Sequence, residues 1–137
     1  MAAHLNLTES IGLAPGSGLE LVEQIERGLP LESLNGLKSK GLTFTEINDT
    51  VISQRTLKHR KARGENLSRD EADRAVRVAS VIALAEQVFG SGAKAMLWLR
   101  SVDDRLGDRT PLSLLVTESG GRLVESLLWA IDEGVYS

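Results

Sequence analysis

The spacing of hydrophobic residues predicts helices along most of the chain. From Leu19 onwards, apolar residues recur every three or four positions, which places them on one face of a helix. Alternating apolar and polar runs bounded by turns, the pattern of half-buried strands, are missing from the sequence. The fold is therefore expected to be all-α. The predicted helices span residues 19–27, 30–41, 44–50, 54–63, 69–89, 93–99 and 119–133, with a short helix from Pro111.

Residues that favour helix ends support several of these boundaries. Ser53 is placed to cap the helix that follows it, because its side-chain oxygen can accept a backbone N–H of the first turn. Thr43 with Glu46, and Ser68 with Glu71, have the spacing of a capping box. Glycine often follows the last residue of a helix, and here the helices are expected to stop at Gly28, Gly41, Gly64, Gly90 and Gly134.

The helices predicted at 44–50 and 54–63 have the layout of a helix-turn-helix. Val51 and Ile52 leave room only for a tight turn between them. In such a motif, side chains near the start of the second helix reach base edges, and later lysines and arginines hold phosphates. Val51 stands where many of these motifs have a glycine. A solvated basic face, or a surface for an acidic protein, is the alternative interpretation.

The second of these helices carries charge of a single sign. The chain has a net charge of −3, yet residues 55–63 contain five basic residues and no acidic one. A solvated face normally mixes its signs, so this block favours contact with a polyanion such as DNA. Leu57 lies roughly opposite the outward face and is expected to anchor the helix to the core. The basic residues are Arg55, Lys58, Arg60, Lys61 and Arg63.

Composition indicates a globular protein without disulfides or a membrane span. The 137 residues are 42% hydrophobic and 26% charged, which is ordinary for one globular domain or two small ones. The absence of cysteine excludes disulfides and thiolate chemistry and is compatible with the cytoplasm, the expected location. No apolar run approaches the roughly 18 residues of a membrane span, and the first 18 residues do not resemble a secretion signal.

The residues do not indicate an enzyme or a metalloprotein. His4 and His59 are too far apart for a metal-ligand spacing or a catalytic pair. The segment from Gly90 to Lys94 lacks the spacing of a phosphate-binding loop. The carboxylates are scattered and form no evident acid/base pair. We therefore expect neither catalysis nor a cofactor.

The long helix at 69–89 is apolar on nearly all sides. Such a helix must be buried on several faces. It is either the central core element or partly a homodimer interface, which would suit a helix-turn-helix because twofold proteins read half-sites about one DNA turn apart. One stripe comprises Ala72, Ala75, Val76, Ala79, Ile82 and Ala83, and the other side carries Val78, Val81, Ala85 and Val88.

The last helix separates an apolar face from a polar one. Trp129 falls on the polar face among charged residues, which is typical of an aromatic anchor with a polar rim at a protein interface. A single exposed aromatic without a role is the alternative, whereas Trp98 is expected in the core. The residues predicted to pack inward are Leu123, Val124, Leu127, Leu128 and Ile131, and the neighbours of Trp129 are Arg122, Glu125, Asp132 and Glu133.

Several short motifs are distinctive through their order and spacing, although none is specific alone. They are Arg55-Thr-Leu-Lys-His-Arg-Lys61, Leu67-Ser-Arg-Asp-Glu-Ala-Asp-Arg74, Val88-Phe-Gly90, Trp98-Leu-Arg100, Arg109-Thr-Pro-Leu112 and the ending from Val124 to Gly134. Together they resemble the Xre/MbcA/ParS antitoxin family, over roughly residues 19–136.

Residues 1–18 are expected to be a flexible segment, because Gly12 to Gly18 includes Pro15 and Ser17. The resemblance implies an Xre-like helix-turn-helix bundle at 19–66 and a small helical toxin-binding domain at 67–137. Family members are antitoxins of type II modules, similar to those that neutralise RES-domain toxins, which are enzymes that consume NAD. They typically form homodimers that assemble with the toxin into a larger complex. They cover the entrance to the toxin's active site and bind operator DNA to repress their own operon.

Site residues follow from the same resemblance together with the basic helix. DNA binding is expected at Ser53, Gln54, Arg55, Thr56, Lys58, His59, Arg60, Lys61 and Arg63. Toxin binding is expected at Arg100, Arg122, Glu125, Trp129, Glu133, Tyr136 and Ser137.

Two positions depart from the family pattern. Val102 stands where a proline is expected, and Asp108 replaces a second glycine before Arg109. Both lie in the loop before the final helices, so they concern the shape of that loop. The rival function is a stand-alone transcriptional regulator, which would use the same basic helix without a toxin partner.

Overall fold

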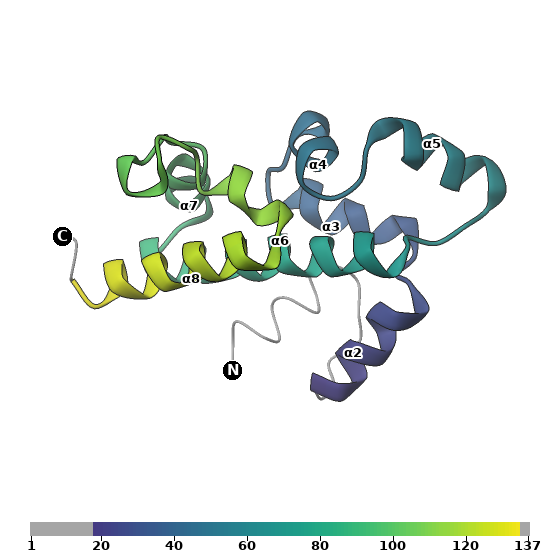
Figure 1. Cartoon of the computed structure of the whole chain (residues 1–137), viewed down its shortest axis with the longest axis horizontal. Coiled ribbons are helices and arrows are strands. Elements are labelled where there is room, and N and C mark those ends of the chain that lie inside the picture. Colours follow the sequence, from purple (N-terminus) through teal and green to yellow (C-terminus); the bar gives the residue numbers. More distant parts are fainter. Residues whose placement is uncertain (1–17, 135–137) are drawn as a thin grey trace.

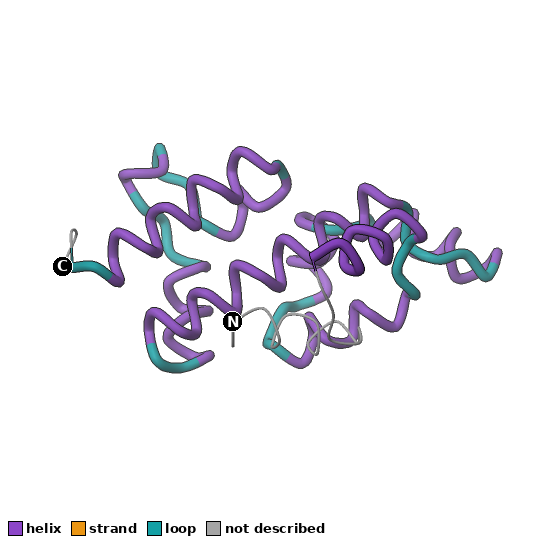
Figure 2. The backbone as a smooth tube through the Cα atoms, turned by 90° about the horizontal axis from the view of Figure 1, so that it is seen from below, coloured by secondary structure: helices purple, strands orange, loops and turns teal. Residues whose placement is uncertain are grey.

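The computed structural model describes residues 18–134, which form helices joined by short turns (Figures 1 and 2). The expected all-α fold is confirmed, because the only β-type pairing within these residues is an isolated bridge between Asp103 and Arg109. The elements, with η marking a 3-10 helix, are α2 (Gly18–Arg27), η1 (Leu31–Ser33), α3 (Leu34–Ser39), α4 (Phe44–Thr50), α5 (Gln54–Arg63), α6 (Arg69–Phe89), α7 (Gly92–Leu99), η2 (Asp104–Leu106), η3 (Leu112–Val116) and α8 (Glu118–Asp132).

Helix α6 is the central element of the fold. It begins with the predicted capping box, in which Ser68 N–H donates to Glu71 Oε1 at 2.7 Å and Glu71 N–H donates to Ser68 Oγ at 3.1 Å. It ends at Gly90, whose φ of 82° lies in the left-handed region that glycine adopts freely. Helices α2, α3, α4, α7 and α8 all pack against it. Both predicted apolar sides are buried, except that Val88 is half-buried. The buried residues of the predicted sets are Ala72, Ala75, Val76, Val78, Ala79, Val81, Ile82, Ala83 and Ala85.

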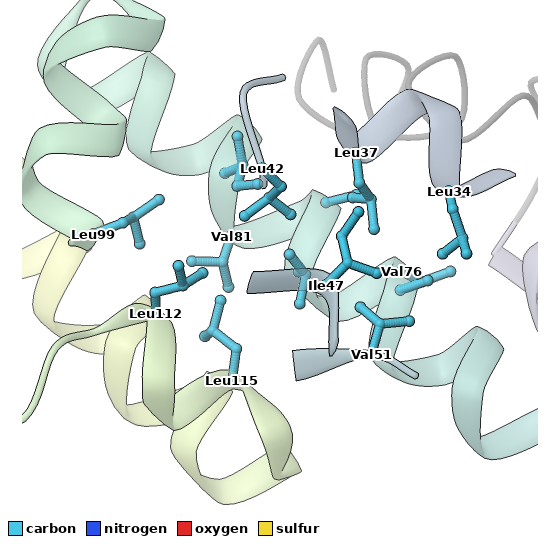
Figure 3. Packing of buried hydrophobic residues seen from close by; sticks show 14 of the residues in the cluster. Leu34, Leu37, Leu42, Ile47, Val51, Val76, Val81, Leu99, Leu112 and Leu115 are labelled. Atoms are coloured by element: carbon cyan, nitrogen blue, oxygen red, sulfur yellow. The ribbon is translucent and has the colours of Figure 1, made fainter. Parts of the chain in front are cut away.

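One hydrophobic core runs through both halves of the described chain. In Figure 3, Val81 of α6 lies between Leu37 and Ile47 from the N-terminal half and Leu99 and Leu115 from the C-terminal half. Each of these five side chains is at most 3% exposed. Because the halves share this core, they are expected to unfold as one cooperative unit.

Two helices lie at opposite ends of the molecule. In Figures 1 and 2, α5 lies at one end of the long axis and the C-terminal end of α8 at the other. Any ligand of α5 would therefore be remote from a ligand of the last turn of α8.

The helix boundaries agree closely with the predictions, and the differences are local. The helix predicted at 30–41 starts as the 3-10 turn η1 and continues as α3, which ends at Ser39. The segment after Pro111 is the 3-10 helix η3. Only five residues separate Pro111 from Thr117, which caps α8, and 3-10 geometry is common in such short pieces.

Packing of the last helix is predicted correctly except at Leu123, which is 51% exposed. The residue lies at the edge of the apolar arc, where packing leaves half of its side chain exposed. Ile131 is half-buried. Trp98 packs against the core as expected, with its ring 5.5 Å from that of Phe89. The fully buried residues of the predicted inward set are Val124, Leu127 and Leu128.

Two expectations concern the chain as a whole. Within residues 18–134, none of the helices has the length and apolar character needed to cross a bilayer. The flexible segment predicted at 1–18 lies outside the described residues, except for Gly18, which opens α2.

Candidate functional site

Helix α5 is capped at its start and anchored to the core by one buried residue, and it presents basic side chains to the surface. Ser53 caps it by accepting Thr56 N–H at 3.1 Å, and the Ser53 hydroxyl also contacts Thr56 Oγ1 at 2.9 Å. Leu57 is the one residue of α5 that is buried, which confirms its predicted role as the anchor. Figure 1 shows α5 standing out from the rest of the molecule. The exposed residues of the predicted DNA-binding set are Ser53, Gln54, Arg55, Lys58, His59, Lys61 and Arg63.

The turn between α4 and α5 is held without a glycine. Val51 has a φ of −120° and is 2% exposed, so this position needs neither a left-handed conformation nor a missing side chain. Asn48 Oδ1 accepts Gln54 N–H at 2.8 Å, which ties the two helices together. Arg74 of α6 donates its Nε–H to the Val51 carbonyl at 2.9 Å. These contacts fix the orientation of the start of α5.

Arg60 differs from the other basic residues of α5. Its Nε and Nη2 each lie 3.1 Å from a carboxylate oxygen of Glu71, and Nη1 lies 3.2 Å from Glu65. Burial acts to raise the pKa of Glu71, but the hydrogen bonds from Arg60 and Ser68 bring that pKa below its ordinary value. Arg60 therefore joins α5 to the start of α6. Its assignment to DNA stays a prediction, in competition with this intramolecular pair.

Near the other end of the molecule, α8 presents Trp129 to the surface. The indole is 45% exposed, and Arg122, Glu125 and Glu133 are exposed on the same helix. Arg122 lies 3.5 Å from Glu118 one turn earlier, and both side chains are at least 70% exposed. Such a surface ion pair is weak, so Arg122 can exchange it for another partner at little cost.

Arg100 lies between the two halves of the chain. It follows α7 and donates to Glu46 Oε2 at 2.7 Å, to Glu46 Oε1 at 2.8 Å and to the Gly41 carbonyl at 2.7 Å. The hydrogen bond from Arg100 lowers the pKa of Glu46, the residue that also completes the capping box of α4 with Thr43. The structure thus directs Arg100 towards α4. Tyr136 and Ser137 lie outside the described residues.

A groove lies between α8 and the turn that contains η2. Its volume is about 230 Å³. We call it the α8 groove and define it by Arg105, Leu106, Leu123, Ser126, Leu127 and Ala130.

Each half of the chain matches a known protein family. The model of the antitoxin Xre-like helix-turn-helix domain matches residues 20–80, and that of the antitoxin Xre/MbcA/ParS C-terminal toxin-binding domain matches residues 84–134. A protein named antitoxin Xre from Pseudomonas putida is 37% identical over 86% of this chain and 74% of its own length. The chain belongs to the Xre antitoxin family.

Further proteins with the same name are similar over most of their length. Antitoxin Xre from Yersinia enterocolitica is 31% identical over 96% of this chain and 90% of its own length. The antitoxin Xre from Photorhabdus laumondii is 29% identical over the same shares of the two chains.

Membership of the Xre family confirms the order of the two parts. A helix-turn-helix domain comes first and a toxin-binding domain follows it. The first match ends and the second begins within α6, so one helix belongs to both parts of the chain. The boundary predicted between residues 66 and 67 stays a prediction.

Some residues at these surfaces were not singled out from the sequence. Asn48 and Arg74 hold the turn between α4 and α5, but polar residues at such spacings are too common in sequences to predict these contacts. Leu106 was not singled out and Leu123 was wrongly predicted to pack inward, for a different reason. Their positions depend on how the loop at 100–110 folds back on α8, and helical periodicity contains no information about that.

Proposed function

We propose that this chain is the antitoxin of a type II module, neutralises a RES-domain toxin and represses its own operon. The observation that carries the proposal is that one core supports both a helix-turn-helix domain and a toxin-binding domain. The exposed basic side chains of α5 support DNA as the ligand of the first domain. The chain supplies no catalysis in this proposal.

Neutralisation is by occlusion of the toxin's active site. Trp129 with its charged neighbours Arg122, Glu125 and Glu133 is an aromatic anchor with a polar rim, the composition of an interface hot spot. Helix α8 and the residues after it cover the entrance to the active site, so NAD cannot enter. The partner is a RES-domain enzyme encoded beside the antitoxin.

Repression depends on α5. Gln54, Arg55 and Thr56 lie in its first turn, where side chains reach base edges, and Lys58, Lys61 and Arg63 follow, where they hold phosphates. The antitoxin binds as a homodimer, because two copies are needed to read the two half-sites of an operator. Antitoxin dimers and toxin then form a larger complex.

Co-expression of the chain with the product of the adjacent gene tests this function. The two proteins are expected to copurify, and the consumption of NAD by the purified neighbour is expected to stop when the antitoxin is added. A DNA fragment from upstream of the operon should bind the same preparation. If the chain binds the upstream DNA but neither binds nor inhibits its neighbour, it is a stand-alone regulator.

A further inference from the structure

The α8 groove is a built feature of the toxin-binding half. Leu127 and Leu106, each 7% exposed, are the most buried of its lining residues. Leu123, at 51% exposed, and the half-buried Ala130 complete its apolar lining. A large aliphatic side chain therefore stands at the surface beside an apolar groove, although its helical position predicts burial.

The wall opposite α8 is held in place before any partner arrives. Asp103 accepts Arg105 N–H at 2.9 Å and the Arg105 guanidinium at 3.0 and 2.7 Å. Its own N–H donates to the Arg109 carbonyl at 3.0 Å, which closes the loop. A rigid wall lowers the entropic cost of binding. Asp103 also neutralises the charge of Arg105 at the edge of the groove. The groove therefore favours an apolar ligand over a charged one.

We propose that the α8 groove receives an apolar side chain of the toxin and extends the toxin-binding surface beyond Trp129. This inference rests on the proposed function. All residues that line the groove lie between 105 and 130, inside the match to the toxin-binding domain at 84–134. By contrast, the pocket beside Arg100 includes Glu46 and Asp49, from the N-terminal half.

The groove and the Trp129 face are neighbours on α8. At roughly 100° per residue, Leu123, Ser126 and Trp129 follow one another around the helix in steps of about 60°. Ser126 lines the groove and is exposed, so it connects Leu123 with the side of the helix that carries Trp129. A partner seated on Trp129 can thus reach the groove along one helix. The result is one surface with an aromatic anchor that enters the toxin and an apolar groove that accepts a toxin side chain.

Substitution of Leu123 tests this inference. Leu123→Asp places a charge where the toxin side chain would lie and is expected to weaken binding to the purified product of the adjacent gene by about tenfold or more. Leu123→Met keeps an apolar side chain of similar volume and should retain binding. Because Leu123 is exposed, both variants should melt at the wild-type temperature and bind upstream DNA as the wild type does.

Val102→Asp is the matched control, since Val102 is 66% exposed in the same half but does not line the groove. Calorimetric titration of each variant with the neighbouring gene product should show full affinity for Val102→Asp and loss for Leu123→Asp. Equal losses in both variants would reflect a general effect of charge and would overturn the role of the groove.

The remaining outcomes separate the groove from the proposed function. If Trp129→Ala weakens toxin binding while Leu123→Asp leaves it unchanged, the function stands and the inference about the groove is wrong. If Leu123→Asp changes only the mass of the free antitoxin in light scattering, the groove is a contact between two copies of this chain, which also overturns the inference. If the wild-type chain does not bind the neighbouring product at all, the proposed function fails and the inference fails with it.

Discussion

At the scale of single residues, Arg60 differs from the other basic residues of α5 because it forms ion pairs within the chain. Its guanidinium contacts Glu71 and Glu65, whereas Lys61 beside it is exposed. Glu71 has a side chain that is only 8% exposed. Removal of Arg60 would leave a largely buried carboxylate without its ionic partner, and such changes are destabilising.

Arg60→Ala is therefore expected to lower the melting temperature of the chain, while Lys61→Ala should leave it unchanged. Thermal unfolding followed by circular dichroism at pH 7 measures both. If Lys61→Ala destabilises as much as Arg60→Ala, the ion pair with Glu71 is not what distinguishes the two residues.

Glu71 and Glu46 also predict how stability depends on pH. The pKa of each is lower in the folded chain than the ordinary value of 4.5, so the unfolded chain binds their protons more tightly. The stability that they contribute is present above pH 4.5 and is lost as the pH falls through the lowered folded pKa. In urea unfolding, Glu71→Gln should lose less stability between pH 5 and 3 than the wild type, by about 1.4 kcal/mol for each unit by which the pKa is lowered. Identical pH profiles for Glu71→Gln and the wild type would contradict the assignment.

Gly120 is required by close packing and not by its backbone conformation. A Cβ at this position would overlap the Leu114 carbonyl oxygen. Gly120→Ala is therefore expected to cost roughly 1–3 kcal/mol of stability, as overpacking usually does. Gly92→Ala is the control, because its Cβ would meet only Glu86 at 3.7 Å, and it should be neutral or stabilise by about 0.4–1 kcal/mol. Urea unfolding of the two variants distinguishes them, and equal stabilities would show that the contact with Leu114 relaxes easily.

Asp108 illustrates a residue whose role became clear only in the structure. The family pattern implies a glycine there, and the φ of Asp108 is 60°, in the left-handed region that glycine favours and aspartate tolerates. Aspartate is therefore compatible with a backbone conformation that glycine favours. A one-residue difference from a family pattern is interpretable once the dihedral angle is known.

At the scale of helices, the start and end signals in the sequence predicted most of the α-helices, but not the 3-10 helices η1 and η2. The Ser53 cap and the capping boxes at Thr43 and Ser68 form as expected, because a cap depends on residues only a few positions apart. The exposed face of α5 could also be predicted, because the face on which a helical residue lies depends only on its position within the helix. Helical periodicity did not predict which element packs against each face of a helix, and Leu123, at the edge of the apolar face of α8, is 51% exposed.

Helix α5 is predicted to bind DNA through its exposed basic side chains. Arg55→Ala combined with Lys58→Ala should abolish binding to upstream DNA without altering the melting temperature, because neither side chain is buried. Each phosphate contact adds about −0.9 to the slope of log affinity against log salt. Fluorescence anisotropy over a range of salt concentrations should show a steep slope for the wild type and a shallower slope for each single variant. A wild-type affinity that is independent of salt would contradict phosphate binding by α5.

At the scale of the molecule, a shared core carries two remote surfaces. The α6 helix and the continuous hydrophobic cluster connect the helix-turn-helix domain to the toxin-binding domain, and Arg100 adds a polar link to α4. The surfaces themselves lie at opposite ends of the long axis (Figure 1). This arrangement allows each surface to be altered without loss of the other, provided that the core stays intact.

The order of the domains could be predicted from the sequence, but their connection could not. The charge along 55–63 and the amphipathic pattern of the last helix each predict a binding surface. The core that unites them depends on contacts between residues far apart in sequence, such as Leu37 with the cluster around Val81. The same reason applies to Arg100, for which its partner Glu46 lies 54 positions away.

The most direct test of two separate surfaces compares two variants in two assays. The variants are Trp129→Ala and the double substitution Arg55→Ala with Lys58→Ala, and each is assayed for inhibition of the neighbouring gene product and for binding to upstream DNA. We expect Trp129→Ala to weaken toxin binding about tenfold or more while DNA binding is unchanged, and the double variant to show the reverse. Loss of both activities in either variant, when circular dichroism shows it to be folded, would contradict the separation of the two surfaces.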